Sequence, residues 1–85
     1  MKYCIASFKS RNQMFGFDKL LKQANIRTEI INTPHRVAVG CSLSIRFSCN
    51  DFPKVKEVYS RTRPSSFVGF YLIDNDFGQV TVRRL

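Results

Sequence analysis

Four short stretches of the chain have the spacing of hydrophobic residues that is typical of β-strands. Residues 2–8 alternate between two sets of side chains that are both largely apolar, which predicts a central strand covered on at least one face. Residues 26–31 read as a second strand, which Asn32, Thr33 and Pro34 interrupt. Residues 43–47 alternate between apolar and polar positions and have one clear apolar face. Residues 67–73 form a continuous apolar run. We therefore predict four strands.

Two stretches between these strands have helical spacing. Ser10 and Gln13 match a capping box, so a first helix should start there and end at Asn25, which tolerates the left-handed conformation. The apolar residues on one side of this helix are Met14, Phe17, Leu20, Leu21 and Ala24. A second helix should be capped by Asn50 or Asp51. Pro53 fits the first turn of this helix, where a missing N–H costs little.

The end of the chain predicts a hairpin. Residues 74–78, with the sequence DNDFG, have strong turn chemistry, and residues 79–85 can return as a short fifth strand. The resulting fold class is α+β, with a ferredoxin-like βαββαβ two-layer sandwich and an additional C-terminal strand. At 85 residues the chain has room for one core, so we expect residues 1–85 to form a single domain.

The charge of the chain is strongly positive. Fourteen basic and six acidic residues give a formal net charge of +8, which attracts anions of any kind. One interpretation is a small module that binds RNA or an acidic protein, with Phe67, Phe70 and Tyr71 as a base-stacking platform. In the alternative interpretation these aromatic residues belong to the core and the charge keeps a small domain soluble. Pairing of two copies through the sheet is a third alternative.

Three cysteines, an odd number without a signal-peptide pattern, predict free thiols and a cytoplasmic location. There is no CxxC pair and only one histidine, His35, so we expect no metal site. No phosphate loop or nucleophile elbow is present, and we expect no cofactor. The longest apolar run has seven residues, whereas a membrane-spanning helix needs about 20, so we expect no membrane span.

Cys41 is the cysteine with the most suggestive neighbours. The small residues Gly40 and Ser42 flank it and leave room to expose a side chain or to aim N–H groups at an anion. The cations near it in the sequence are His35, Arg36 and Arg46. A cation close to the sulfur would favour the thiolate, which is the reactive form. Alternatively, Cys41 is a small apolar residue that fills space at the end of a strand.

The other two cysteines lie in different surroundings. Cys4 falls inside the first strand, where a core position is expected. Cys49 lies beside the start of the second helix, whose dipole can favour a thiolate, so it is a second candidate for a reactive sulfur. Cys49 could also act as a resolving partner for Cys41, although the strand at 43–47 separates the two.

Several motifs together resemble a known family, the small selenium/sulfur carrier-like proteins. They are KYCIASFKS at the start, DKLLKQANI at the end of the first helix, TP before the loop, and above all GCSLSIRF. The resemblance extends from Met1 to about Ile73. It implies that Cys41 accepts sulfur or selenium as a persulfide-type adduct, and that the chain exchanges this atom with donor and acceptor proteins. Four positions depart from the family's pattern: the family more often has Arg in place of His35, Ser at positions 38 and 39, and Gly in place of Ser42.

Overall fold

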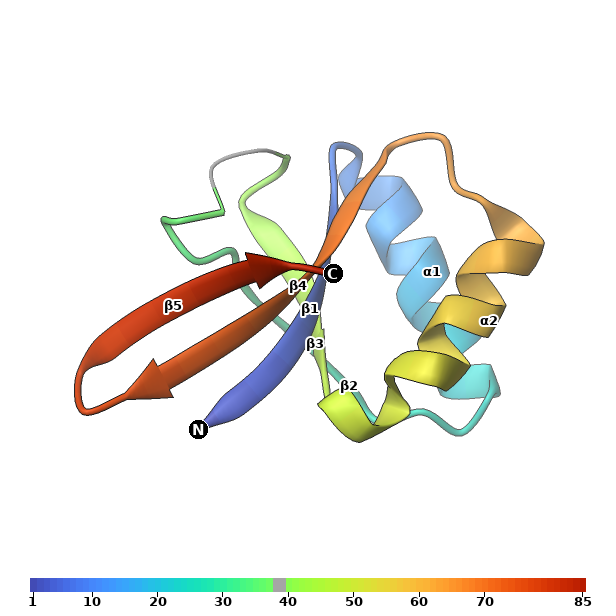
Figure 1. Cartoon of the computed structure of the whole chain (residues 1–85). Coiled ribbons are helices and arrows are strands. Elements are labelled where there is room, and N and C mark those ends of the chain that lie inside the picture. The colour runs from blue at the N-terminus through green and yellow to red at the C-terminus, as the bar shows by residue number, and fades with distance from the viewer. Residues whose placement is uncertain (38–39) are drawn as a thin grey trace.

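Two helices cover one face of a five-stranded sheet (Figure 1). The computed structural model describes residues 1–37 and 40–85. Its elements are β1 (Lys2–Phe8), α1 (Arg11–Gln23), β2 (Thr28–Asn32), β3 (Leu43–Phe47), the 3-10 turn η1 (Cys49–Asp51), α2 (Phe52–Thr62), β4 (Phe67–Asp76) and β5 (Gln79–Arg84). The hairpin of β4 and β5 extends away from the helices (Figure 1).

The sheet is antiparallel, with the strand order β2-β3-β1-β4-β5. The α+β class and the additional C-terminal strand are therefore confirmed. The element order βαββαββ and the strand order β2-β3-β1-β4-β5 are not those of a four-stranded ferredoxin-like βαββαβ sandwich, and the difference is the predicted fifth strand. Strand β5 pairs with β4 over six residue pairs, so it extends the sheet beyond the four strands of a ferredoxin-like fold.

The main core lies between the sheet and the helices. Strand β1 contributes Cys4, Ala6 and Phe8 to it, and helices α1 and α2 cover these residues with their apolar faces. The buried apolar residues of the two helices are Met14, Phe17, Leu21, Val55 and Val58. A smaller cluster of Ile5, Val37 and Ile73 lies on the opposite face of the sheet. Both faces of β1 are thus covered, as the two apolar sets of its sequence predict.

The first helix begins and ends where the sequence predicts. Ser10 is its N-cap and accepts a hydrogen bond from the Gln13 N–H, and Asn25 follows the helix with a φ of 62°. Strand β2 starts later than predicted, at Thr28 instead of residue 26, because the Ile26 N–H still bonds to the Leu21 carbonyl. Ile26 is buried in the main core instead.

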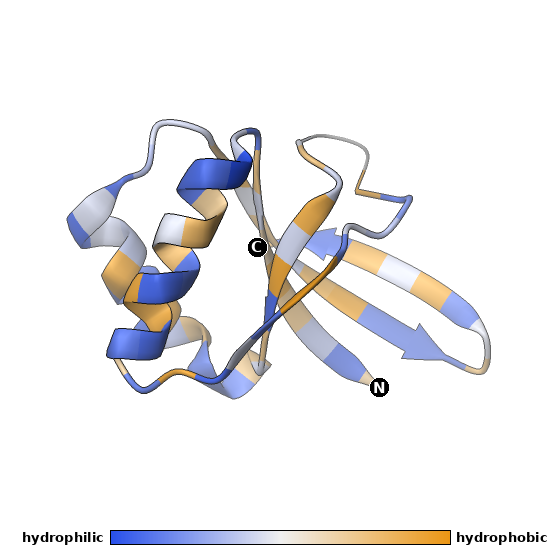
Figure 2. Cartoon of the chain, turned by 180° about the vertical axis from the view of Figure 1, so that it is seen from behind, coloured by the Kyte–Doolittle hydropathy of each residue, from blue (hydrophilic) through white to orange (hydrophobic). Residues whose placement is uncertain are grey.

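The turn of the C-terminal hairpin is shorter than predicted. Strand β4 continues to Asp76, so only Phe77 and Gly78 form the turn. Both residues have positive φ, 51° and 78°, as a two-residue hairpin turn of type I′ requires. Along β5 the apolar and polar residues alternate, which Figure 2 shows as alternating colours.

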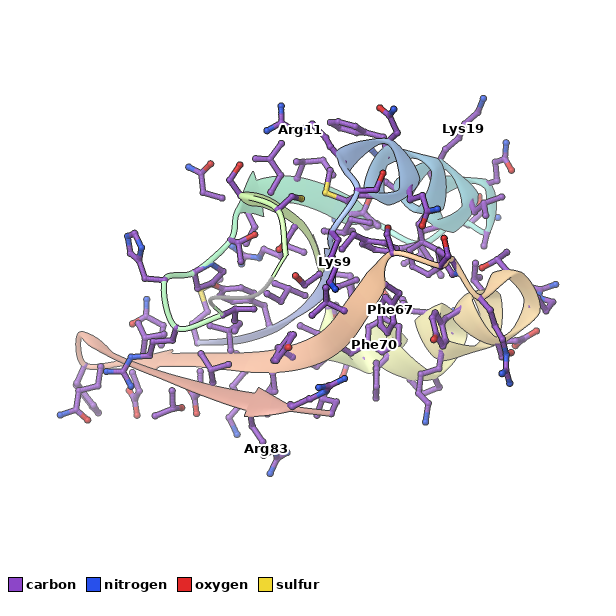
Figure 3. The ribbon with its side chains drawn as sticks, turned by 90° about the horizontal axis from the view of Figure 1, so that it is seen from above. Lys9, Arg11, Lys19, Phe67, Phe70 and Arg83 are labelled. Carbon is purple, nitrogen blue, oxygen red and sulfur yellow. The ribbon has the colours of Figure 1, made fainter. Side chains whose placement is uncertain are left out.

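Phe67 and Phe70 pack in the core, as one of the two interpretations of the aromatic residues requires. The register between β1 and β4 shifts between Ser7 and Phe8, so Phe8 pairs with Phe67 and Ser7 pairs with Gly69. This bulge places both rings on the helix side although they are three residues apart. Their centroids lie 4.7 Å apart, and both contact the Tyr59 ring of α2. Figure 3 labels Phe67 and Phe70 side by side.

Candidate functional site

Cys41 lies in the connection between β2 and β3, at the end of the sheet where β1 ends. Its N–H donates a 2.7 Å hydrogen bond to the Phe8 carbonyl, and its own carbonyl accepts a 3.0 Å bond from the Thr33 hydroxyl. The Thr33 N–H also bonds to the Ser42 carbonyl at 2.7 Å. The backbone on both sides of the Cys41 side chain is therefore fixed, although the residue lies outside regular secondary structure.

Gly40 is required by the shape of this segment. Its φ is 110°, a region that residues with a side chain rarely adopt. A Cβ at this position would lie 2.8 Å from the Phe8 carbonyl oxygen and 2.8 Å from the Ser7 hydroxyl. The absence of a side chain lets the segment approach β1 closely and brings Cys41 into hydrogen-bonding range of Phe8.

The Cys41 side chain is half-buried. It packs against the edge of the main core, and its Sγ donates a 3.0 Å hydrogen bond to the Leu43 carbonyl. Only the protonated thiol can donate this bond. Cys41 also lines an open hollow of about 530 Å³, together with Asn32, Thr33, Pro34, His35, Val37, Gly40 and Ser42. In this conformation the sulfur is a thiol at the margin of a hollow that is open to solvent.

The structure brings together some of the residues predicted for the site and separates others. His35, Gly40 and Ser42 line the hollow with Cys41. Arg36 is exposed in the same connection, beside His35. Arg46 lies further along β3, where its guanidinium stacks over the Tyr3 ring at 4.3 Å from the centroid. Arg46 is thus held on the sheet and is not among the residues that line the hollow.

Arg11 is a cation near Cys41 that sequence reasoning missed. It is the first residue of α1, and its Nη2 donates to the Ser42 hydroxyl at 3.4 Å. Arg11 and Ser42 are 31 residues apart in the sequence. The capping box at Ser10 could have predicted this contact. It places the start of α1 just beyond the end of β1, and β3, which runs antiparallel to β1, has to begin at the same end of the sheet.

Cys49 is not close to Cys41. Strand β3 separates them, and five residues at about 3.3 Å each span roughly 16 Å. A disulfide needs Cα atoms within about 7 Å, so Cys49 cannot resolve an adduct on Cys41 in this fold. The prediction that Cys4 is a core residue is confirmed. The Sγ of Cys49 instead lies 2.8 Å from the Sγ of Cys4.

Among residues 1–37 and 40–85, no three His, Cys, Asp or Glu side chains come together as a metal ion would require. Neither of the two helices that the structure describes is long and apolar enough to cross a membrane.

Comparison with known proteins gives one match. Searches of curated proteins and of solved structures find nothing similar to this chain. Residues 3–64, however, match the sequence model of the family described as "Putative Se/S carrier protein-like". The matched segment runs from β1 to the end of α2 and contains Cys41 and its whole connection. Because it covers nearly three quarters of the 85 residues, the chain belongs to this family of selenium/sulfur carrier-like proteins.

Proposed function

We propose that the protein is a cytoplasmic carrier in which Cys41 accepts a sulfur or selenium atom and passes it to an acceptor protein. The family supports the cargo, and it implies partner proteins that handle sulfur. The observation that carries the assignment to Cys41 is the position of its half-buried sulfur at an open hollow, on a backbone that is fixed on both sides.

The transfer needs no external oxidant or reductant. The Cys41 thiolate attacks the terminal sulfur of a donor persulfide, R–S–SH. The S–S bond of the donor breaks, R–S⁻ leaves and takes a proton, and Cys41 becomes a persulfide. Release to the acceptor is the same exchange in the opposite direction, with an acceptor thiolate as the nucleophile.

The surroundings of Cys41 suit this exchange. The thiol must first give up its hydrogen bond to the Leu43 carbonyl, which frees the sulfur to turn toward the hollow. His35 lines the hollow, and Arg11 donates to the hydroxyl of Ser42, which also lines it. Positive charge favours a thiolate or a persulfide anion beside it. The net charge of +8 also favours docking of acidic donor and acceptor proteins.

The RNA-binding alternative loses its predicted platform. Phe70 is 7% exposed and Phe67 packs on Phe8 and Tyr59, so these two rings cannot stack on bases. Of the three predicted platform residues, only Tyr71 lies on the face away from the helices. A filter-binding assay at low salt tests the form of this alternative that needs no stacking, in which basic side chains bind RNA phosphates. Such binding should fall steeply as salt is added.

Site-specific loading with a persulfide tests the carrier proposal. The protein is incubated with glutathione persulfide, alkylated, and digested with trypsin, which leaves the three cysteines in separate peptides, 3–9, 37–46 and 47–54. We expect the added sulfur on Cys41 at ten or more times the level on Cys4 or Cys49. Cys41→Ser should abolish this loading, and Cys49→Ser should leave it intact. Equal loading of all three cysteines, or no loading, would overturn the proposal.

A further inference from the structure

Two of the three cysteines are already close enough to react with each other. The Sγ atoms of Cys4 and Cys49 are 2.8 Å apart, and both residues are free thiols. A disulfide bond is about 2.05 Å long, so the two sulfurs lie about 0.8 Å beyond bonding distance. The pair is at the opposite end of β1 from the Cys41 hollow, and it has no part in the carrier function proposed above.

The fold holds the two cysteines in this position by two separate constraints. In the sheet, Cys4 of β1 pairs with Phe47, the last residue of β3. The chain then turns into the helix layer, because the Ser48 hydroxyl accepts the Asn50 N–H and the Ser48 carbonyl accepts the Asp51 N–H. This turn forms η1 and places Cys49 over Cys4, whose side chain faces the helix layer.

Solvent access and charge give the two sulfurs different roles. Cys4 is 1% exposed, whereas Cys49 is half-buried and can be reached by a small oxidant. Burial raises the pKa of Cys4 to about 12, and the hydrogen bond to Cys49 and the repulsion by a negative Cys49 add to this effect. Cys49 is therefore the sulfur that a small oxidant meets first, and Cys4 lies behind it.

We propose that Cys49 and Cys4 form a second sulfur site, a dithiol that hydrogen peroxide converts reversibly into a disulfide. Cys49 is the sulfur that the peroxide oxidises, and Cys4 is the sulfur that resolves the product. This site is independent of Cys41.

The reaction is balanced with peroxide as the only oxidant. The Cys49 thiolate attacks one peroxide oxygen, the O–O bond breaks, and hydroxide leaves, so Cys49 becomes a sulfenic acid. The Cys4 sulfur then attacks the Cys49 sulfur, an S–S bond forms, and the sulfenic oxygen leaves as water with the Cys4 proton. The two thiols lose two electrons in total, and one peroxide becomes two waters. A thiol reductant reverses the change.

Peroxide treatment of the full-length Cys41→Ser variant tests the proposal, because this background removes the carrier site. We expect the two remaining thiols to disappear together, the intact mass to fall by two hydrogens, and trypsin to release peptide 3–9 linked to peptide 47–54. Dithiothreitol should restore both thiols. The link should form at least ten times faster in the folded protein than in urea, because the fold holds the sulfurs together.

A second substitution separates the two roles. Adding Cys49→Ser should slow the loss of the Cys4 thiol to peroxide at least tenfold, because the buried Cys4 cannot react first. Adding Cys4→Ala should instead leave Cys49 to proceed to sulfinic acid. If Cys4→Ala does not fold, the Cys49→Ser variant and the comparison with urea still decide the question. Oxidation of Cys49 to sulfinic acid with Cys4 still free in the Cys41→Ser background, or linkage at equal rates in urea, would overturn the proposal.

Discussion

The guanidinium of Arg11 donates a hydrogen bond to the hydroxyl of Ser42, and so connects the first turn of α1 to the segment that carries Cys41. The bond is long, at 3.4 Å, and both side chains are exposed. Its structural contribution is therefore small, and the main effect of Arg11 on this segment is its positive charge. Figure 3 shows Arg11 at the start of α1 and Lys19 further along the same helix.

Replacing Arg11 by Gln should therefore slow the reaction of Cys41 with anionic reagents. We expect the rate of alkylation by iodoacetate to fall severalfold, and the rate with neutral iodoacetamide to fall less, because the lost charge acts on both the reagent and the thiolate. Lys19→Gln removes the same charge from the exposed side of α1 and is the matched control. Equal slowing by both substitutions would show that the effect comes from net charge alone.

Gly40→Ala should destabilise the protein. The new Cβ would lie 2.8 Å from two oxygens of β1, and a φ of 110° is strained for alanine. We expect the free energy of unfolding, measured with urea, to fall by about 1–3 kcal/mol. Gly16→Ala is the control, because Gly16 lies in α1 with no atom within 4 Å of the added Cβ. That substitution should stabilise the protein by about 0.5–1 kcal/mol.

The Cys4 thiol should make the protein less stable at high pH. Its pKa rises from 9.0 in the unfolded chain to about 12 in the folded one, chiefly because of burial. Between these values the unfolded chain has released the proton and the folded chain still holds it. The contribution of the Cys4 thiol to the free energy of unfolding is thus fully present below pH 9. Between pH 9 and pH 12 it is lost, by up to about 1.4 kcal/mol per pH unit.

Urea unfolding at several pH values between 8 and 11, with reductant present, measures this decline. Cys4→Ala lacks the thiol, so its stability should fall less steeply with pH than that of the wild type. The titrating groups that do not contact Cys4 are shared by the two proteins, and their contributions cancel in the comparison. Parallel pH profiles would show that the Cys4 thiol titrates normally.

Oxidation of the Cys4 and Cys49 pair should stabilise the fold. The disulfide would join residues 45 positions apart. Closing a loop of that size lowers the entropy of the unfolded chain, which should raise the free energy of unfolding by about 2–4 kcal/mol. For a chain of this size, Tm should rise by about 10 °C or more. Thermal unfolding of the Cys41→Ser variant before and after peroxide measures the gain. The same treatment of a Cys41→Ser, Cys49→Ser variant should produce none.

The sequence was sufficient for features that depend on neighbouring residues. The cap at Ser10, the left-handed Asn25 and the strand at Leu43–Phe47 all follow from local patterns, and all three are confirmed. The turn after Asp76 was predicted too long, because the residues DND continue the strand once β5 pairs with them. Pairing with another strand overrides the local preference of those residues for a turn.

Features that depend on distant parts of the chain were not predicted. The contact of Arg11 with Ser42 and the contact of Cys4 with Cys49 join residues 31 and 45 positions apart. Both depend on the register between β1 and β3, which a pattern of apolar residues does not define by itself. The common position of Phe67 and Phe70 depends on a bulge, which simple alternation cannot anticipate.

Strand β5 forms one edge of the described sheet, and this position affects how the protein behaves at high concentration. The unpaired backbone N–H and C=O groups of an edge strand can bind a strand of a second chain, and charged side chains on the edge oppose this pairing. Arg84 folds back to donate to the Val68 carbonyl, whereas Arg83 is exposed and points away from β5 (Figure 3). Salt screens the repulsion between these charges, and the screening length falls from about 10 Å at 0.1 M to about 3 Å at 1 M. Concentrated stocks should therefore stay clear at low ionic strength and become turbid as salt is added.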